Sequence, residues 1–313
     1  MKAFVCSKFG STDFLQLREV EKPIPKDKEV LVKIKATTVT IGDTIIRNGK
    51  HPDSKFYTVM LHVAFGFRKL RKSILGMELA GVVESIGKDV TRFKPGDHVF
   101  GSTFSIGFAA HAEYKCFPEN GMLVLKPDNI TFDKAATIPG GGMTALGVLR
   151  KANLKNGSTN QSDKLKVLIN GASGAVGSSA VQLAKYFGAE VTGVCSGANL
   201  ELVKSLGADK VIDYTKVDFT ENGEKYDVVF DAVHKLDSSK AKKSLKDSGK
   251  YFDVLKDTSD KEKVEDLIFL KELIEAGKLK AVIDRHFPFD QIPEAHTYVE
   301  KGHKKGNVVI DVV

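Results

Sequence analysis

The chain has 313 residues, of which 42% are hydrophobic and 28% charged, with a formal net charge of +7. This length leaves room for two domains of ordinary size, and no apolar run approaches the ~20 residues that a membrane-spanning helix needs. The first residues lack the long apolar core of a signal peptide, so the cytoplasm is the expected compartment. The basic residues are interleaved with acids, so no nucleic-acid partner is expected.

The chain contains three cysteines, Cys6, Cys116 and Cys195, which lie far apart in the sequence. An odd number of distant cysteines is typical of a reducing compartment rather than of a disulfide framework. No two of them form a CxxC pair, which argues against a structural zinc site. Cys116 has no neighbouring histidine, so we expect no nucleophilic role for it.

The first part of the chain, to about residue 117, has the pattern of an antiparallel barrel or sandwich. EVLVKIKATTV (29–39) alternates apolar and polar residues, and ELAGVVESIG (78–87) and GDHVFGS (96–102) are β-rich runs bounded by glycine. Between them, FYTVMLHVAFGFRKLRK (56–72) joins apolar and aromatic residues to a basic cluster. We expect a packed or pocket-lining loop there, with weak association to a membrane surface as the alternative.

From about residue 122, short apolar runs alternate with helical patterns. Such alternation predicts a parallel sheet, because parallel neighbours need a crossover connection. The candidate strands are KVLIN (166–170), EVTGVCS (190–196), KVIDY (210–214), YDVVFDAV (226–233), GKYFDV (249–254) and KAVID (280–284). A polar surface loop, KNGSTNQSD (155–163), precedes the first of them, and NVVIDVV (307–313) is expected to return to the first domain. We therefore predict one domain over 1–121 and 285–313, and another over 122–284.

A glycine cluster follows the first candidate strand of the second domain, in LINGASGAVGSSAVQLAK (168–185). Against the GxGxxG dinucleotide fingerprint, Ala172 takes the first position, and Gly174 and Gly177 take the second and third. The second glycine lets the backbone approach a pyrophosphate, and the third lets the helix pack on the strand. A strand before and an amphipathic helix after the cluster strengthen this interpretation.

The end of the second candidate strand bears on the choice of cofactor. An NAD site usually carries Asp or Glu about 20 residues past the motif, whereas this chain has VCSGAN (194–199) there. No carboxylate in that stretch repels a 2′-phosphate, and Ser196 can donate a hydrogen bond to it. The sequence therefore favours NADPH, with NADH possible but less favoured.

Four further motifs extend this pattern over nearly the whole chain: GMELAGVVESIGKDVTRFKPGDHVFG, TVTIGDTIIRNG, IPGGGMTALG and LGADKVIDY. With them, the chain resembles the medium-chain dehydrogenase/reductase superfamily, in its zinc-independent quinone oxidoreductase (zeta-crystallin-like) branch. The resemblance implies an α/β protein, with a Rossmann doubly wound parallel sheet domain and a GroES-like β-barrel-type N-terminal domain. It also implies a homodimer, since members usually pair through an edge strand of the Rossmann sheet.

The zinc enzymes of this superfamily carry Gly-His-Glu where this chain has Gly76, Met77 and Glu78. Glu78 alone cannot hold Zn²⁺, which needs a tetrahedral set of donors, so we expect no metal. Without a Lewis acid to stabilise an alkoxide, quinones and α,β-unsaturated carbonyls are the expected acceptors. The alternatives are an NAD(P)-dependent alcohol or aldehyde dehydrogenase and a non-catalytic NADPH-binding protein.

The resemblance also suggests site residues. Thr144 is the expected contact of the nicotinamide, and Thr40 and Asp43 are the other catalytic candidates. Tyr214 resembles a tyrosine that lies against the 2′-phosphate, and His234 is expected to be a solvated loop histidine rather than an acid. The expected cofactor contacts are Gly171, Ala172, Ser173, Gly174, Ala175, Val176, Gly177, Ser196, Asn199, Tyr214, Ala232, Val233 and Asn307.

Overall fold

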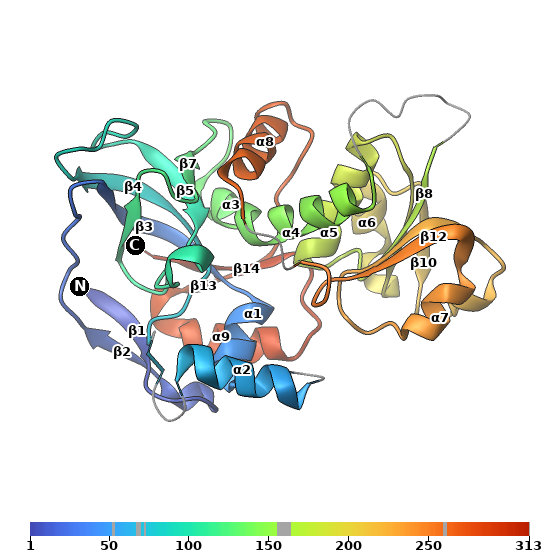
Figure 1. Cartoon of the computed structure of the whole chain (residues 1–313), viewed down its shortest axis with the longest axis horizontal. Helices are drawn as coiled ribbons and strands as arrows, with labels where there is room; N and C mark the ends of the chain where they lie inside the picture. The colour runs from blue at the N-terminus through green and yellow to red at the C-terminus, as the bar shows by residue number, and fades with distance from the viewer. Residues whose placement is uncertain (52–53, 67–69, 72, 155–163, 259–261, 313) are drawn as a thin grey trace. The chain divides into compact units, whose positions relative to one another are not determined.

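The structure is a computed structural model that describes residues 1–51, 54–66, 70–71, 73–154, 164–258 and 262–312. The polar segment 155–163 and part of segment 56–72 lie outside the described residues. The chain forms two compact units (Figure 1). Unit 1 comprises Met1–Pro139, Lys263–Lys271 and Ile283–Val313, and unit 2 comprises Gly140–Glu262 and Glu272–Val282. Unit 1 extends past the expected boundary at residue 121, because β7 (Leu123–Leu125) pairs with one of its strands. The division before Ile283 lies two residues from the expected one after residue 284, and Lys263–Lys271 also belong to unit 1.

Unit 1 is built on a largely antiparallel sheet with the order β13-β14-β3-β4-β5-β7, and β6 also pairs with β3. The long central strand β3 (Glu29–Val39) has the bounds that the alternating pattern predicted. The other strands are β4 (Glu78–Ile86), β5 (His98–Ser102), β6 (Tyr114–Pro118), β13 (Ile283–Pro288) and β14 (Asn307–Asp311). The pairing of β14 with β3 confirms the predicted return of the C-terminal segment to the first domain.

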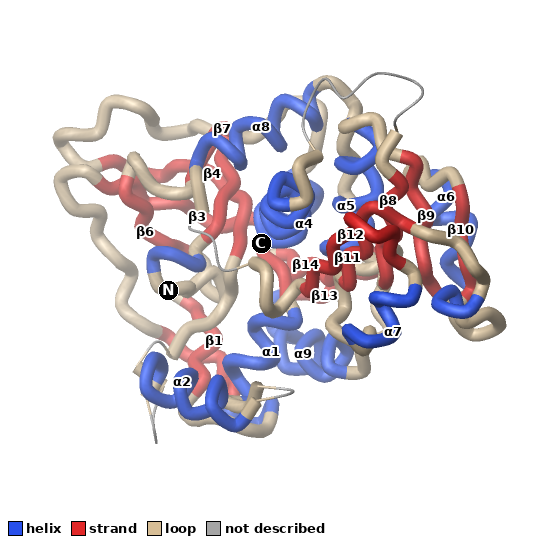
Figure 2. Tube along the Cα trace, turned by 45° about the vertical axis from the view of Figure 1, so that its right-hand side comes forward, coloured by secondary structure: helices blue, strands red, loops and turns tan. Residues whose placement is uncertain are grey.

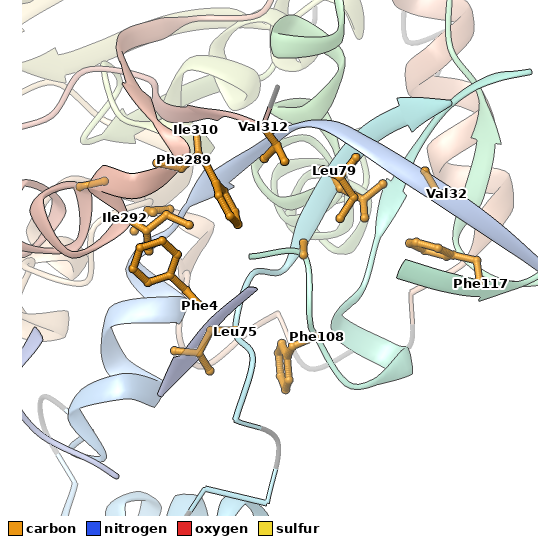
Figure 3. Close-up of a cluster of buried hydrophobic side chains, with 14 of the residues drawn as sticks. Phe4, Val32, Leu75, Leu79, Phe108, Phe117, Phe289, Ile292, Ile310 and Val312 are labelled. Carbon is orange, nitrogen blue, oxygen red and sulfur yellow. The ribbon is translucent and has the colours of Figure 1, made fainter. Parts of the chain in front are cut away.

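Buried aromatic and aliphatic side chains from both ends of the chain form the core of unit 1. Phe4, Leu79 and Phe117 come from the N-terminal part, and Phe289 and Ile310 come from the C-terminal part (Figure 3). A separate two-stranded sheet joins β1 (Lys2–Cys6) to β2 (Leu15–Glu19). Burial of side chains from segments so distant in sequence explains why the last residues belong to this unit.

Unit 2 contains a five-stranded parallel sheet with the order β10-β9-β8-β11-β12. Its strands are β8 (Lys166–Asn170), β9 (Glu190–Cys195), β10 (Lys210–Asp213), β11 (Tyr226–Asp231) and β12 (Leu245–Asp253). Five of the six predicted strands are therefore confirmed. The sixth, KAVID, is wrong: the backbone of Lys280 pairs with the side-chain amide of Gln182, and β13 starts at Ile283 and pairs with β14 in unit 1.

Helices connect these strands, and Figure 2 marks them in blue. They are α1 (Ile41–Asn48), α2 (Lys55–Phe65), α3 (Phe132–Ala136), α4 (Ile138–Lys151), α5 (Ala175–Tyr186), α6 (Leu200–Ser205), α7 (Ser238–Lys243), α8 (Val264–Glu275) and α9 (Ile292–Glu300). The prediction of a loop at the start of segment 56–72 is wrong, since α2 occupies it. Within the described ranges, no helix combines the length and the apolar character needed to cross a bilayer.

Candidate nucleotide site

The glycine cluster forms a tight turn between β8 and α5. Gly171 has a φ of +78°, and a Cβ there would lie 2.3 Å from Val233 Cγ1. A Cβ on Gly177 would lie 2.1 Å from the carbonyl oxygen of Gly171, so helix α5 approaches the turn as closely as glycine allows. Both positions exclude other residues on steric grounds, as the sequence analysis predicted for Gly177.

Gly174 is different, because a Cβ there would meet only the Gly171 oxygen, at an ordinary distance of 3.4 Å. Gly174 is the N-cap of α5, and no side chain caps the free backbone N–H groups of this helix. Uncapped amides at the start of a 12-residue helix form a favourable site for an anion. The geometry fits the diphosphate of a dinucleotide at this position.

The site lies where the order of the parallel sheet reverses. From β8 the chain continues to β9 on one side, whereas β11 lies on the other side of β8. Ligands of open α/β sheets bind outside the carboxyl ends of the strands at such a switch point. The expected contacts in unit 2 follow the carboxyl ends of four of these strands, with Gly171–Gly177 after β8, Ser196 and Asn199 after β9, Tyr214 after β10, and Ala232 and Val233 after β11.

Hydrogen bonds link several of these predicted contacts. The Asn199 side-chain amide donates to the hydroxyl oxygens of Ser173 and Ser196, at 3.2 Å each. The Tyr214 backbone N–H donates to the carbonyl of Cys195 at 3.1 Å, and the Tyr214 side chain is 57% exposed. The structure thus gathers Ser173, Ser196, Asn199 and Tyr214 at one edge of the sheet.

Asp213 is a charged residue beside this edge that the sequence analysis missed. It is the last residue of β10, and a Cβ on Gly197 would lie 2.6 Å from its Oδ2 atom. The Thr215 hydroxyl donates to this carboxylate at 2.7 Å and holds its pKa below the ordinary value. A carboxylate therefore does lie next to the segment after β9. It comes from the neighbouring strand, so the spacing rule applied to one strand could not find it.

A second polar network holds the loop after β11. The buried carboxylate of Asp231 accepts hydrogen bonds from the backbone N–H groups of Lys235 and Leu236, at 2.7 Å each, and from the Asn170 side chain at 2.9 Å. The N–H of Ala232 donates to the carbonyl of Asn170 at 3.0 Å. Hydrogen bonds therefore link the carboxyl ends of β8 and β11, in addition to the backbone pairing along the two strands.

His234 belongs to this network, and its expected solvated position is wrong. The side chain is only 12% exposed, its Nδ1 lies 2.5 Å from Asp253 Oδ2, and its backbone φ is +54°. The Tyr251 hydroxyl donates to Leu236 O at 3.1 Å, and burial together with nearby Asp carboxylates raises the pKa of that hydroxyl. A left-handed backbone at a non-glycine residue persists only where its surroundings hold it, and Asp253 supplies that support.

In unit 1, Thr40 and Asp43 form the N-terminal cap of α1. The Asp43 N–H donates to Thr40 Oγ1 at 3.1 Å, and the Thr40 N–H and hydroxyl donate to Asp43 Oδ2 at 2.9 and 2.7 Å. The other Asp43 oxygen accepts from the Gly76 N–H at 2.9 Å, and Asp43 is fully buried. Thr40 is thus a helix cap and not a strand residue, and the catalytic roles of both residues stay predictions.

The surroundings of Glu78 do not form a metal site. Its Oε1 atom accepts a hydrogen bond from the Thr38 hydroxyl at 2.5 Å. The sulfur of the neighbouring Met77 lies 3.5 Å from Thr40 Oγ1. Across the part of the chain that the structure describes, no group of three or more His, Cys, Asp or Glu residues could hold a metal ion. These donors do not fit the tetrahedral set that zinc requires.

Lys304 is another residue that the sequence analysis missed. Burial lowers the pKa of its amine to about 8, while the carboxylates of Glu78 and Asp284 oppose that change. The amine donates to the carbonyl of Gly306 at 2.6 Å. No motif marks this lysine, because its environment includes Glu78, which lies more than two hundred residues away in the sequence.

The remaining candidates lie on separate elements. Thr144 is half-buried on α4, one turn after Gly141, whose Cβ would lie 2.7 Å from the carbonyl of Ala175. Asn307 is buried at the start of β14 in unit 1. Their contacts with a cofactor stay predictions. Burial raises the pKa of each of the three cysteine thiols to about 11, so none of them is a ready nucleophile at neutral pH.

Comparisons with known proteins agree with this arrangement. A family described as alcohol dehydrogenase GroES-like domain matches residues 26–128, and families described as zinc-binding dehydrogenase match 175–273 and 258–310. The chain is 36% identical to a 2-methylene-furan-3-one reductase of Solanum lycopersicum and 35% identical to a chloroplastic NADPH-dependent alkenal/one oxidoreductase of Arabidopsis thaliana. Both matches cover 99% of this chain and 79% of the relative.

A solved structure, that of the quinone oxidoreductase from Coxiella burnetii, aligns with a TM-score of 0.84 at 29% identity. The alignment covers 100% of this chain and 99% of that one. The predicted pairing of a GroES-like domain with a Rossmann domain is confirmed. The chain belongs to the medium-chain dehydrogenase/reductase superfamily, in its quinone oxidoreductase branch, and is an oxidoreductase that uses a nicotinamide cofactor.

Proposed function

We propose that this protein transfers a hydride from NADPH to a quinone or an α,β-unsaturated carbonyl without a metal ion. The uncapped N-terminus of α5 at the switch point of the sheet carries the proposal, because it offers backbone amides and open space to a diphosphate. The names of two relatives, an alkenal/one oxidoreductase and a quinone oxidoreductase homolog, support this choice of acceptor.

The absence of a fitting set of metal donors among the described residues also bears on the acceptor. A simple carbonyl needs a Lewis acid or strong hydrogen-bond donors to stabilise the alkoxide that forms. A conjugated acceptor spreads the charge onto a distant oxygen, so correct alignment and hydrogen bonds suffice. The donor set around Glu78 therefore favours conjugated acceptors over simple alcohols and aldehydes.

NADPH is the proposed carrier, and when bound it supplies the hydride. Ser196, linked to the glycine turn through Asn199, and the exposed ring of Tyr214 are the proposed contacts of the 2′-phosphate. The carboxylate of Asp213 acts against this preference, because it is ionised at neutral pH and lies beside Gly197. We infer a preference for NADPH that is weaker than the preference that a basic residue next to the 2′-phosphate would give.

His234 is the proposed source of the proton that completes the reduction. Hydride addition leaves an enolate or a quinol anion, and one proton from the imidazole neutralises it; solvent then returns a proton to the ring. Asp253 orients the ring through Nδ1 at 2.5 Å, and the ring follows β11 at the switch point of the sheet. Val233, its neighbour in sequence, contacts the glycine turn.

A panel of quinones and enones, with simple aldehydes and alcohols beside them, tests the proposal after treatment with a chelator. We expect NADPH oxidation with the conjugated acceptors, and a His234→Gln variant that binds NADPH normally but loses kcat. Activity that needs added zinc and an alcohol would contradict the metal-free assignment. Tight NADPH binding without turnover of any acceptor would instead support a non-catalytic protein.

The assembly and compartment that we propose are a homodimer in the cytoplasm. Strand β12 ends the five-stranded sheet on one side, and extension of that edge by a second copy would cover its free backbone groups. The three cysteines are free, as expected in a reducing compartment. Light scattering of the purified protein measures the mass, and a monomer at micromolar concentration would contradict the dimer.

A further inference from the structure

Helix α2 of unit 1 is apolar on two opposite sides. Its inner side packs on the core of unit 1 through Leu61 and Phe65, which are partly buried. The ring of Phe65 lies 5.4 Å from that of Phe108, and His62 on the same side contacts the ring of Phe9 at 4.4 Å and the carbonyl of Gly49 at 3.0 Å. These contacts fix the rotation of the helix about its axis.

The outer side of α2 is therefore held away from the core. It carries four large apolar side chains, and the exposed fractions are 68% for Phe56, 56% for Val59, 51% for Met60 and 54% for Val63. The spacing i, i+3, i+4 and i+7 places them on one face of a helix. Large apolar side chains are normally buried, so this exposed face is suited to a partner that accepts apolar side chains.

The described charged residues within and next to α2 in the sequence are basic. Lys50 and Lys55 before and within the helix and Arg71 after it are exposed, and no acidic residue occurs in α2. An apolar helix face next to clustered basic residues is the pattern of helices that lie in the interface of an anionic membrane.

We propose that α2 binds the protein to the surface of an anionic membrane, with Phe56, Val59, Met60 and Val63 inserted below the headgroups. Lys50, Lys55 and Arg71 contact the lipid phosphates, while the inner side of α2 keeps the helix attached to unit 1. A second copy of the chain is a poorer occupant, because an interface between two α2 helices would bring Lys50 and Lys55 of both copies together with no acidic residue of α2 to pair with them.

This inference does not depend on the proposed function, since membrane binding needs neither cofactor nor turnover. The two can therefore fail separately. If both hold, the enzyme works at the surface in which apolar quinones dissolve, and vesicles that contain such a quinone are its natural assay.

The test is cosedimentation of the full-length protein with phosphatidylcholine vesicles, with and without phosphatidylglycerol. Because basic residues near an anionic surface strengthen binding, we expect the partition coefficient to be at least about tenfold higher with the anionic lipid, and to fall as salt is added. A Val59→Asn/Val63→Asn variant should lose at least about tenfold of this binding. The matched control is Val217→Asn, which replaces a valine of unit 2 that is 47% exposed.

A second measurement tests the proposal without the double variant, in case that variant folds poorly. A Met60→Cys variant can be labelled with an environment-sensitive fluorophore, because the other thiols are buried or half-buried. The emission of the label should shift to the blue with anionic vesicles only. Equal binding to both kinds of vesicle, or unchanged binding by the double variant, would overturn the proposal. So would a wild-type dimer that the double variant converts to a monomer, since α2 would then be an interface between copies.

Discussion

Two helix N-termini of this protein, at α1 in unit 1 and α5 in unit 2, follow motifs that the sequence analysis marked as functional, yet they have opposite chemistry. At α1, the side chains of Thr40 and Asp43 cap the helix, and Asp43 also holds the Gly76 amide. At α5, glycine is the N-cap and no side chain caps the helix. Free amides at a helix start need a partner. Those of α1 are satisfied within the fold, whereas those of α5 can donate to the diphosphate that we propose.

The largest expected effect comes from giving α5 the kind of cap that α1 has. Gly174→Asp should fold with unchanged or higher thermal stability, because a side chain there meets only Gly171 O at 3.4 Å. Binding of NADPH should weaken at least about a hundredfold, roughly 3 kcal/mol, since the new carboxylate occupies the amides and repels the diphosphate. Calorimetric titration and thermal denaturation measure the two effects.

A glycine in α4 provides the control for that substitution. A Cβ on Gly147 would meet nothing within 4 Å, so Gly147→Ala should leave the Kd for NADPH unchanged and stabilise the helix slightly. If Gly174→Asp binds NADPH as tightly as the wild type, the start of α5 is not the diphosphate site and the comparison of the two termini fails.

Removing the cap of α1 is the converse experiment. Asp43→Ala leaves the N–H groups of Thr40 and Gly76 without their acceptor, which should lower the free energy of unfolding by about 2 kcal/mol. If this carboxylate acts only as a cap, the kcat of the folded enzyme should stay within about threefold of wild type. Urea denaturation and steady-state kinetics separate the two quantities, and Thr40→Ser, which keeps the cap, is the control. A large loss of kcat at unchanged stability would instead support the predicted catalytic role of Asp43.

Lys304 extends the comparison to a buried charge of unit 1. Its amine has a pKa of about 8 when folded and an ordinary value of 10.5, so between these pH values the unfolded chain binds a proton that the folded one does not. Stability from this group therefore rises with pH across that window, and the penalty is complete below pH 8. Lys304→Met should raise the free energy of unfolding at neutral pH by about 1 to 2 kcal/mol.

That gain should shrink as the pH rises from 8 to above 10.5, since only above 10.5 is the wild-type amine mostly neutral in both the folded and the unfolded state. Urea denaturation of both proteins over this pH range provides the measurement. Lys235→Met, which replaces an exposed lysine of unit 2, is the control for removal of a positive charge. A gain that does not change with pH would contradict the lowered pKa.

The smallest effect concerns the choice between the two nicotinamide carriers. Asp213→Asn removes the negative charge beside Gly197 and should raise the ratio of kcat/KM for NADPH to that for NADH about fivefold. Asp209→Asn, at the other end of β10, is a control, because its carboxylate pairs with Lys185 at 2.7 Å. An unchanged ratio in Asp213→Asn would separate this carboxylate from the 2′-phosphate.

Regular elements and the glycine turn were predictable because their signals are local. Strands β3 and β8 have the predicted bounds, and Gly174 and Gly177 occupy the predicted positions in the turn before α5 and in its first residues. Hydrophobic periodicity and the steric demands of glycine act between residues that are near in the sequence. The prediction of a strand at KAVID failed for a related reason. A short apolar run has the local pattern of a strand, but whether it forms one depends on a neighbouring strand with which it can pair.

Local pattern therefore predicted the two-part α/β architecture, the strands in their order along the chain and the position of the glycine turn before α5. The tertiary structure decided which polar groups are already satisfied and which remain available. Asp213 reaches Gly197 from the next strand, Asp253 holds His234 from another, and the inner side of α2 is known only from its contacts with the core. The energy of a polar or apolar side chain depends on neighbours that folding brings from distant segments, and no periodicity in the chain records them.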